Sequence, residues 1–328
     1  MRIVDEITGF ESRIEALRQK SWLQIEKRAD SAYILQPKAA IEGPKPISLT
    51  LMAIVHGNEV AGTTILNQVL DAILSETIIL RQPLAVVLGN CAAAAQGKRY
   101  LERDLNRSFN RPDAGDAESK RAVQLSSILD ETHLLLDIHQ TKEPAENPFF
   151  IFPYSKSGLA LARNISMDIP VVTHWGTPFS SEGMCTDEYT NTKGGCGITL
   201  EVGQNGFHPF RVGTGVHAVL KTLAFSQRCW DEGSLPNWTP TDENLNAFGF
   251  SDIVPYPTNG SVHLEDGLHN FTPVSKGQVL GQINGQDFSA EQDGLILFPQ
   301  YMRHGETNRP AELFRLLSPL KVNQLPKD

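Results

Sequence analysis

The sequence predicts an α/β protein in which a mixed, mostly parallel β-sheet is flanked by helices and followed by a small C-terminal all-β domain. Two observations predict the sheet: strand-like and helix-like segments alternate after residue 27, and the strand-like ones are short and almost wholly apolar. Such strands are typical of parallel sheets that are covered on both faces. A third observation is the polar, proline-rich stretch "WDEGSLPNWTPTDENLN", which is typical of a linker and separates residues 1–230 from residues 240–328.

The elements expected in residues 1–230 begin with a helix at residues 8–27. It has Phe10, Ile14, Leu17, Trp22 and Ile25 at roughly helical spacing. The strands expected after it are residues 31–36, 47–55, 84–90, 133–139, 149–153 and 197–203. The helices expected between and after them are residues 59–76, 116–131, 157–165 and 215–229. The helix at residues 116–131 carries acids in its first turn, where the helix dipole favours them.

Residues 240–328 contain short strand-like pieces with frequent glycine. These pieces lie at residues 261–266, 270–274, 276–285 and 293–299, and they predict a small β domain. "PVSKGQVLGQI" followed by "DGLILFP" resembles the half-barrel sandwich of lipoyl-type domains. Lys276 lies outside the hairpin context in which that family's lysine is modified, so the resemblance implies an architecture and no lipoylation.

Charge and composition exclude several classes of protein. The formal net charge is 29 − 38 = −9 and no block is rich in Lys or Arg, so we expect no nucleic-acid partner. No apolar segment approaches the length that spans a bilayer, and the N-terminus carries acids where a signal peptide needs an apolar run. The four cysteines form no C-x-x-C pair and are expected to be reduced thiols. We therefore expect a cytoplasmic protein with no membrane partner.

Four polar residues stand at or next to the ends of predicted strands: His56, Asn90, His139 and Glu201. Sheets of this kind place their sites at the carboxyl ends of the strands. The common location predicts that these residues belong to one site.

The stretch "AIVHGNEVAG" sets His56 and Glu59 three residues apart. This spacing alone fits half of a metal site, and it equally fits a strand end followed by an acid that stabilises a first helical turn. "LLLDIHQT" supplies a candidate third ligand in His139, since catalytic zinc usually has three protein ligands. Asp137 lies on the same side of that strand and could orient a ligand. The alternative for His139 is a buried neutral histidine.

The segment "KRYLERDLNRSFN" is rich in arginine, which recurs every four residues at Arg99, Arg103, Arg107 and Arg111. A solvated charged face would look similar, but the apolar residues around Asn106 and Arg107 favour an anchored segment. A guanidinium beside an amide suits a carboxylate, because arginine can bind it through two hydrogen bonds. Another arginine of this segment could hold the oxyanion of a polarised carbonyl.

In "GITLEVGQ", Glu201 is an acid within an otherwise apolar strand. Buried acids are rare unless they are paired or functional. Next to a metal, such a carboxylate would serve as a general base and would then pass its proton to a leaving amine. The alternative is a structural ion pair.

Five motifs in this order, "HGNEVAG", "GN" at residues 89–90, "RYLERDLNRSF", "DIHQT" and "LEVGQ", resemble the succinylglutamate desuccinylase/aspartoacylase family of the zinc carboxypeptidase superfamily. The resemblance covers about residues 50–210, and the C-terminal β domain also fits the family. It implies a zinc carboxypeptidase-like fold with one Zn²⁺ per chain. The residues it implies are the zinc ligands His56, Glu59 and His139, the general base Glu201, the carbonyl-polarising Arg99, the carboxylate-binding Asn106 and Arg107, and Asn90 at the start of the segment leading to Arg99.

Two departures from the family pattern concern the substrate. Aspartoacylase-like members carry another arginine about ten residues before the general base, whereas this chain has Asn191 and Lys193 there. The segment after His139 also differs. The resemblance therefore implies a zinc-dependent hydrolase of an N-acyl amino acid or similar small anionic amide. It does not identify the acyl group. A carboxypeptidase acting on short peptides and a non-catalytic binding protein on the same fold are the alternatives.

Overall fold

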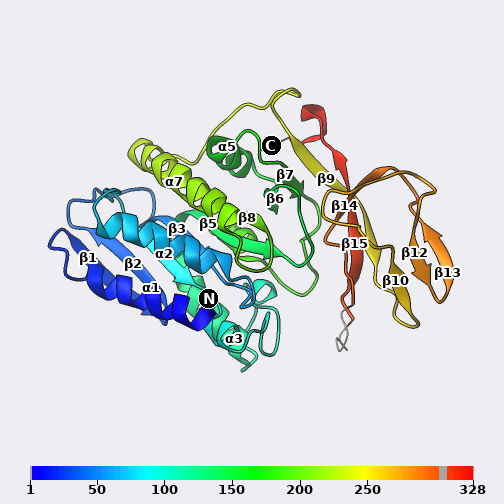
Figure 1. Ribbon diagram of the computed structural model, residues 1–328. Coiled ribbons are helices and arrows are strands. Elements are labelled where there is room, and N and C mark those ends of the chain that lie inside the picture. Colours follow the sequence, from blue (N-terminus) through cyan, green and yellow to red (C-terminus); the bar gives the residue numbers. More distant parts are fainter. Residues whose placement is uncertain (1, 303–308, 328) are drawn as a thin grey trace.

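The computed structural model describes residues 2–302 and 309–327, and it contains one sheet of twelve strands and one of three (Figure 1). In the described residues the helices are α1 (Ile3–Leu17), α2 (Ala61–Leu74), α3 (Cys91–Ala95), α4 (Ala117–Asp130), α5 (Lys156–Ile165), α6 (Thr186–Thr192) and α7 (Pro209–Glu232), with 3-10 turns at Leu105–Arg107 and Val322–Gln324. None of these helices is both long and apolar enough to cross a membrane.

The strands of the large sheet are ordered β1-β2-β4-β3-β5-β8-β6-β7-β9-β15-β14-β11. Their bounds are β1 (Leu23–Ala29), β2 (Ala32–Pro37), β3 (Ile47–Ala53), β4 (Leu84–Leu88), β5 (Thr132–Thr141), β6 (Phe149–Pro153), β7 (Val171–His174), β8 (Cys196–Gln204), β9 (Ala247–Pro255), β11 (Pro273–Val274), β14 (Gly294–Leu297) and β15 (Glu312–Pro319). The small sheet has β10 (Val262–Leu264), β12 (Val279–Ile283) and β13 (Gln286–Ser289).

The centre of the large sheet is parallel, as the apolar strands predict. Strand β3 pairs in parallel with β4 and β5, and β5 pairs in parallel with β8, whereas β6 runs antiparallel to β8. Every residue of β3, β4 and β5 is buried. The prediction of a mixed sheet flanked by helices is therefore confirmed, with parallel pairing concentrated at its centre and antiparallel pairing at both ends.

Both faces of this sheet carry a hydrophobic core. On one face, residues of α1, α2, α5 and α7 pack against β3, β5 and β8, and Figure 1 shows α1, α2 and α7 side by side over the strands. On the other face, α4 and Tyr189 of α6 pack with Met52 of β3 and Leu135 of β5. A strand covered on both faces needs apolar side chains in both directions, which explains the continuous apolar runs.

The helix expected at residues 8–27 is wrong in its second half. Helix α1 ends at Leu17, and Leu23–Ala29 form the antiparallel edge strand β1, which pairs with β2. Residues 23–29 are mostly exposed or half-buried, so their pattern is weak, and pairing with the apolar β2 decides their conformation. The short helices α3 and α6 were not expected either, because neither is long enough to display helical periodicity.

The C-terminal region continues the large sheet. Strand β9 pairs in parallel with β7 and antiparallel with β15, which then carries β14. Residues of this region also form a core of their own around Leu280, Ile296 and Phe314, beside the small sheet seen at the far end in Figure 1. The division into domains at residues 1–230 and 240–328 stays a prediction. The sheet itself runs through both parts.

Candidate metal and active site

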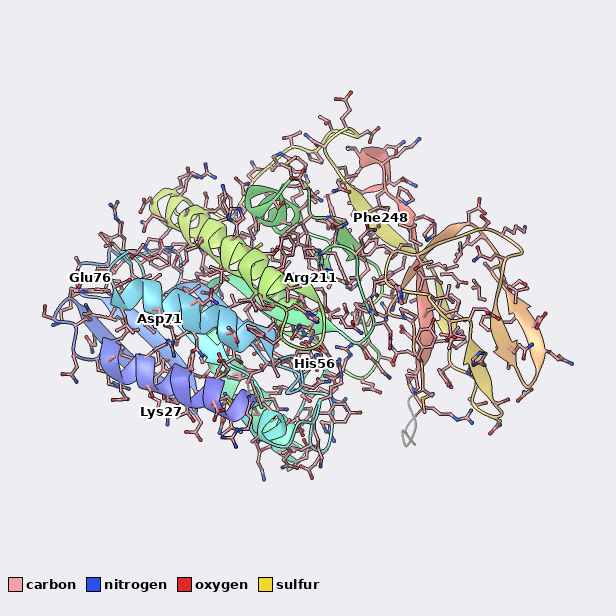
Figure 2. The ribbon with its side chains drawn as sticks, viewed as in Figure 1. Lys27, His56, Asp71, Glu76, Arg211 and Phe248 are labelled. Carbon is pink, nitrogen blue, oxygen red and sulfur yellow. The ribbon has the colours of Figure 1, made fainter. Side chains whose placement is uncertain are left out.

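The polar residues expected at strand ends gather at one edge of the sheet. His56 and Glu59 follow β3, and His139 of β5 lies directly opposite Glu201 of β8 in the parallel ladder. Figure 2 shows His56 beside the first turn of α2, on the side that faces the C-terminal strands. The register of three adjacent strands is thus what brings these side chains together.

His56, Glu59 and His139 form a compact buried cluster. The Nδ1 atom of His56 lies 2.7 Å from Oε1 of Glu59, and Nδ1 of His139 lies 2.9 Å from Oε2. One ligand atom from each of the three residues lies within 4.8 Å of the others. Two imidazole nitrogens and one carboxylate on a common centre are a donor set that zinc takes in hydrolases. The residues present therefore fit a zinc ion.

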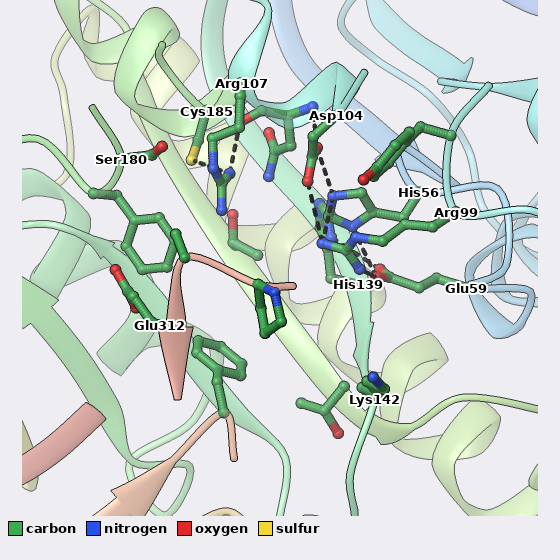
Figure 3. A pocket seen from close by; sticks show the side chains of 18 of the residues that line it. His56, Glu59, Arg99, Asp104, Arg107, His139, Lys142, Ser180, Cys185 and Glu312 are labelled. Carbon is green, nitrogen blue, oxygen red and sulfur yellow. Dashed lines mark hydrogen bonds and ion pairs between the residues drawn. The ribbon is translucent and has the colours of Figure 1, made fainter. Parts of the chain in front are cut away.

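The outer nitrogens of both histidines face carboxylates. Oδ1 of Asp104 lies 3.0 Å from Nε2 of His56, and Oδ2 of Asp137 lies 2.9 Å from Nε2 of His139 (Figure 3 shows the Asp104 contact). A carboxylate at Nε2 favours the tautomer with its proton there, which leaves Nδ1 of His139 able to bind a metal. At His56, Nη2 of Arg99 also lies 2.8 Å from Nε2, so Asp104 and Arg99 together hold this ring in place. Sequence reasoning placed Asp137 in this role but not Asp104, which comes from a segment distant in sequence.

The charges of this cluster are mutually stabilised. Burial alone would raise the pKa of Glu59, but His56 and His139 beside it hold the pKa well below its ordinary value. Burial opposes protonation of His139, and the carboxylates of Asp137 and Glu59 outweigh it and raise the pKa. The backbone N–H of Gln140 also donates to Oε2 of Glu59 at 3.0 Å. The cluster is a carboxylate-rich setting suited to a cation.

Glu201 differs from the acids around it. Its side chain is buried, and within residues 2–302 and 309–327 its Oε2 atom has no hydrogen-bond partner. Burial and the neighbouring Glu59 raise the pKa of Glu201 to about 8. A divalent cation beside it would lower that pKa again. Glu201 thus lines the cavity and has a buried carboxylate oxygen that is available for a proton.

Arg99 lies over the cluster on a loop. Its Nη1 donates to Oε1 of Glu59 at 3.0 Å, and its side chain is 41% exposed. The loop is held by Glu118 of α4, a buried acid that accepts the backbone N–H groups of Leu101 at 2.7 Å and Glu102 at 3.1 Å. The acid at 118 was visible in the sequence as a helix-dipole residue, but nothing there indicated that it anchors another segment.

Asn106 and Arg107 lie on the far side of the same segment. The Oδ1 atom of Asn106 accepts the backbone N–H of Thr186 at 3.0 Å, which leaves the amide nitrogen of Asn106 as the donor. Arg107 donates from Nη1 to the backbone oxygen of Asn106 at 2.7 Å and contacts Sγ of Cys185 at 3.2 Å. Its Cζ lies 4.9 Å from the ring centroid of Phe179. Both residues line the cavity.

Asn90 is not brought together with these residues. Its Oδ1 accepts the backbone N–H of Ala93 and caps α3, and its Nδ2 donates to Oε1 of Glu118 at 3.0 Å. It is not among the described residues that line the cavity. Asn191 and Lys193, where relatives were expected to carry an arginine, are not among them either. Asn90 instead supports the loop of Arg99 through Glu118.

The cavity in front of the cluster has a volume of about 1040 Å³ (Figure 3). Its walls include residues that sequence reasoning missed, among them His174, Phe179, Asp187 and Arg315. Arg315 of β15 is buried and donates to both carboxylate oxygens of Glu312, at 2.6 and 2.7 Å. Its Cζ atom lies 4.0 Å from the ring centroid of Phe179. The C-terminal region therefore forms part of the wall of the site.

Comparison with known proteins gives one family match. A model of the succinylglutamate desuccinylase/aspartoacylase catalytic domain matches residues 45–224. Among curated proteins, the chain is 28% identical over 303 residues to the succinylglutamate desuccinylase of Pseudomonas syringae pv. tomato, which covers 87% of this chain and 86% of the relative. It is 29% identical over 280 residues to that of Serratia proteamaculans, with 78% and 82% covered.

Solved structures share the fold. The succinylglutamate desuccinylase of Chromobacterium violaceum superposes with a TM-score of 0.69 at 22% identity, covering 96% of this chain and 98% of that one. That of Vibrio parahaemolyticus gives 0.71 at 17% identity, with 94% and 95% covered. Murine aminoacylase 3 gives 0.63 at 20% identity, with 85% and 97% covered. The likeness extends over both the helix-covered sheet and the C-terminal strands.

Proposed function

Since the chain belongs to the succinylglutamate desuccinylase/aspartoacylase family and is a deacylase that hydrolyses an amide bond, we propose that its substrate is an N-acyl amino acid or similar small amide bearing a carboxylate, and that zinc is its cofactor. The observation that carries this proposal is the buried group of His56, Glu59 and His139 next to Glu201. Neutral imidazoles and a carboxylate are ligands that zinc accepts.

The three ligands in this proposal are Nδ1 of His56, Nδ1 of His139 and the carboxylate of Glu59, with Asp104 and Asp137 orienting the two imidazoles. When bound, zinc would supply Lewis acidity toward a water molecule and the scissile carbonyl. The other steps depend on side chains of the chain itself.

Glu201 is the proposed general base. Its unpartnered Oε2 accepts a proton from the attacking water and then gives that proton to the nitrogen of the leaving amine. Arg99 is the proposed oxyanion-stabilising residue, because its guanidinium lies over the cluster and its partly exposed side chain lines the cavity.

Asn106 and Arg107 are the proposed binding residues for the substrate carboxylate. The amide oxygen of Asn106 is engaged by Thr186, so the group that remains for a ligand is the NH₂ donor. Arg107 uses Nη1 for contacts within the protein and keeps the rest of its guanidinium for an anion. A small anionic molecule suits this arrangement. We also propose that residues 240–328 close one wall of the site through Arg315 and Glu312.

The test is a metal analysis joined to an activity screen. Purified protein should contain one zinc per chain and hydrolyse one or more of a panel of N-acetyl and N-succinyl amino acids faster than dipeptides. Removing the metal with a chelator should abolish hydrolysis, and adding zinc should restore it. Full activity in metal-free protein, or hydrolysis of dipeptides alone, would contradict the proposal.

A further inference from the structure

The wall of the cavity contains a buried carboxyl group that the proposed chemistry does not use. Asp187, in the first turn of α6, is 4% exposed and lines the cavity. Its Oδ1 accepts the backbone N–H of Glu188 at 2.8 Å, and its Oδ2 accepts the hydroxyl of Thr199 at 3.1 Å. A carboxylate offers about four acceptor positions, so about half of its hydrogen-bonding capacity remains.

Gly197 explains how this carboxyl reaches the cavity wall. A Cβ atom at residue 197 would lie 2.8 Å from the Cα of Asp187, so only glycine lets α6 lie directly on β8 at this point. The carboxyl of Asp187 then meets Thr199, which is two residues before Glu201 on the same strand. Residues two apart point to the same face and stand about 7 Å apart. Asp187 is therefore a near neighbour of the proposed general base.

Asp187 also adjoins the residues proposed to bind the substrate carboxylate. The preceding residue, Thr186, donates its backbone N–H to Asn106, and Cys185 before it contacts Arg107. The carboxyl thus lies between the residues that hold the carboxylate and the residue that receives the proton. In an N-acyl amino acid, the part between these two points is the amino-acid half, so its side chain is the group that would meet Asp187.

The charges around Asp187 are unfavourable for a second substrate carboxylate. In the described part of the chain Asp187 has no ion pair, and the acids Glu188 and Asp137 are the charged groups that raise its pKa most. The buried arginine of this wall, Arg315, is already paired with Glu312. Burial and these acids raise the pKa of Asp187 to about 7, as expected for a buried carboxyl without a cation.

From this geometry we infer that Asp187 determines specificity by accepting an N–H group from the amino-acid side chain of the substrate, which would be cationic or an amide and not a carboxylate. This inference rests on the proposed deacylase function. An N–H donor would occupy the remaining acceptor positions of the carboxyl group, and a positive charge would supply the missing counter-ion. A carboxylate at the same place would face an unpaired acid.

The first experiment compares substrates in the zinc-loaded wild type. N-acetyl-L-ornithine, N-acetyl-L-glutamine and N-acetyl-L-glutamate are assayed side by side, and the three N-succinyl derivatives likewise. We expect kcat/KM for the ornithine derivative to exceed that for the glutamate derivative by about tenfold or more, with most of the difference in KM. A preference for the glutamate derivative in the hydrolysed series would overturn the inference.

The second experiment tests whether Asp187 is the residue responsible for the preference for the ornithine derivative. Asp187→Asn keeps the shape and should lower the ornithine-to-glutamate ratio by about tenfold, the effect of a lost charged partner. Asp130→Asn is the matched control, because it removes an acid that accepts the hydroxyl of Tyr189 in the same helix as Asp187 and is not among the described residues lining the cavity. An unchanged ratio in Asp187→Asn, or an equal change in Asp130→Asn, would overturn the assignment.

A binding measurement separates the inference from the proposed function. Titration calorimetry of the free products L-ornithine and L-glutamate into zinc-loaded protein needs no catalysis. Tighter binding of L-ornithine, lost in Asp187→Asn, is the expected result. Hydrolysis of N-acyl amino acids with tighter binding of L-glutamate would refute the inference alone. Loss of hydrolysis for every N-acyl amino acid tested would refute the proposed function and the inference with it.

Discussion

Two parts of the site are built in different ways. The proposed metal half consists of His56, Glu59, His139 and Glu201 and lies at the ends of adjacent strands. The proposed substrate half consists of Asn106, Arg107, Phe179, Asp187 and Arg315, which come from a 3-10 turn, a loop, a short helix and a C-terminal strand. Strand register fixes the first half, whereas the second depends on contacts between distant segments. The first can therefore be located by spacing along the chain, and the second only in part, through Asn106 and Arg107.

The largest expected effect comes from removing the proposed general base of the metal half. Glu201→Gln should lower kcat by about a thousandfold, since general-base catalysis contributes in that range. Zinc content, measured by atomic emission, should stay at one per chain because Glu201 is not a proposed ligand. A kcat within tenfold of the wild type would remove Glu201 from the role of base.

The next largest effect is expected from weakening the carboxylate-binding residue Arg107 of the substrate half. Arg107→Lys should raise KM about a hundredfold and leave zinc content unchanged, because a lysine cannot bind a carboxylate through two parallel hydrogen bonds. Steady-state kinetics on the preferred substrate measure it. Arg111→Lys serves as the control, since Arg111 belongs to the same sequence series but is not among the described residues that line the cavity. Equal changes in both variants would argue against a specific role for Arg107.

A third prediction concerns His133, which lies at the other end of β5 from His139 and away from the metal half. Burial lowers the pKa of His133 to about 4, and no acid of the metal half acts on it. The unfolded chain would bind a proton near pH 6.5 while the native protein would not, so stability should fall as pH drops from 6.5 towards 4. Between pH 7.5 and 5 the loss amounts to about 2 kcal/mol.

The measurement for His133 is urea unfolding of the wild type and His133→Gln at pH 7.5 and pH 5. The variant should lose about 2 kcal/mol less over this interval, because it has no group to titrate. Parallel pH dependences in the two proteins would show that His133 is not the residue responsible.

The smallest expected effect concerns the link between the halves. The hydroxyl of Thr186 donates to Oδ2 of Asp137 at 2.5 Å, and Asp137 faces His139. Thr186→Val should weaken zinc binding about tenfold, the range found when a partner of a metal ligand is lost. KM should change little, because the backbone N–H that holds Asn106 remains.

Competition with a zinc-binding dye measures this affinity, and Thr190→Val is its control. Among the described residues, the hydroxyl of Thr190 bonds only to the backbone oxygen of Thr186 in the same helix, so its removal should leave zinc affinity unchanged. If Thr186→Val binds zinc as tightly as the wild type, the two halves are not coupled through this hydroxyl.

The difference between the two halves also explains which parts of the fold and the site can be predicted from the sequence. The apolar strands predicted the parallel centre of the sheet, and residues at the strand ends predicted a cluster that the structure does assemble at one edge. Asn90 shared that signal, but the chain continues directly into α3 and its amide is used as a helix cap. A strand end therefore indicates a place for functional residues, and the next few residues decide whether a side chain faces the cavity.

Within the substrate half, the sequence predicts Asn106 and Arg107, but Phe179, Asp187 and Arg315 gave no comparable signal. Asp187 lies in a short helix, and Phe179 lies in a loop that is positioned by Glu188 and by Arg315 from more than a hundred residues later. The contacts of Arg107 and Arg315 with the ring of Phe179 become apparent only in three dimensions. Contacts over such separations leave no periodicity along the chain, so no local pattern could have found them.

The anchoring of the Arg99 loop by Glu118 has a consequence for engineering the protein. The carboxylate of Glu118 binds the backbone N–H groups of residues 101 to 103, whose side chains it does not contact through these bonds. The side chains of Glu102 and Arg103 add bonds of their own, to the backbone N–H of Ala117 at 2.7 Å and to the carboxylate of Asp116 at 2.8 Å. Of the three, only Leu101 can therefore vary without the loss of a polar contact. The length of the loop cannot vary, because an inserted or deleted residue would carry the amides out of reach of the carboxylate. Libraries that vary this region should keep Glu102, Arg103 and the residue count.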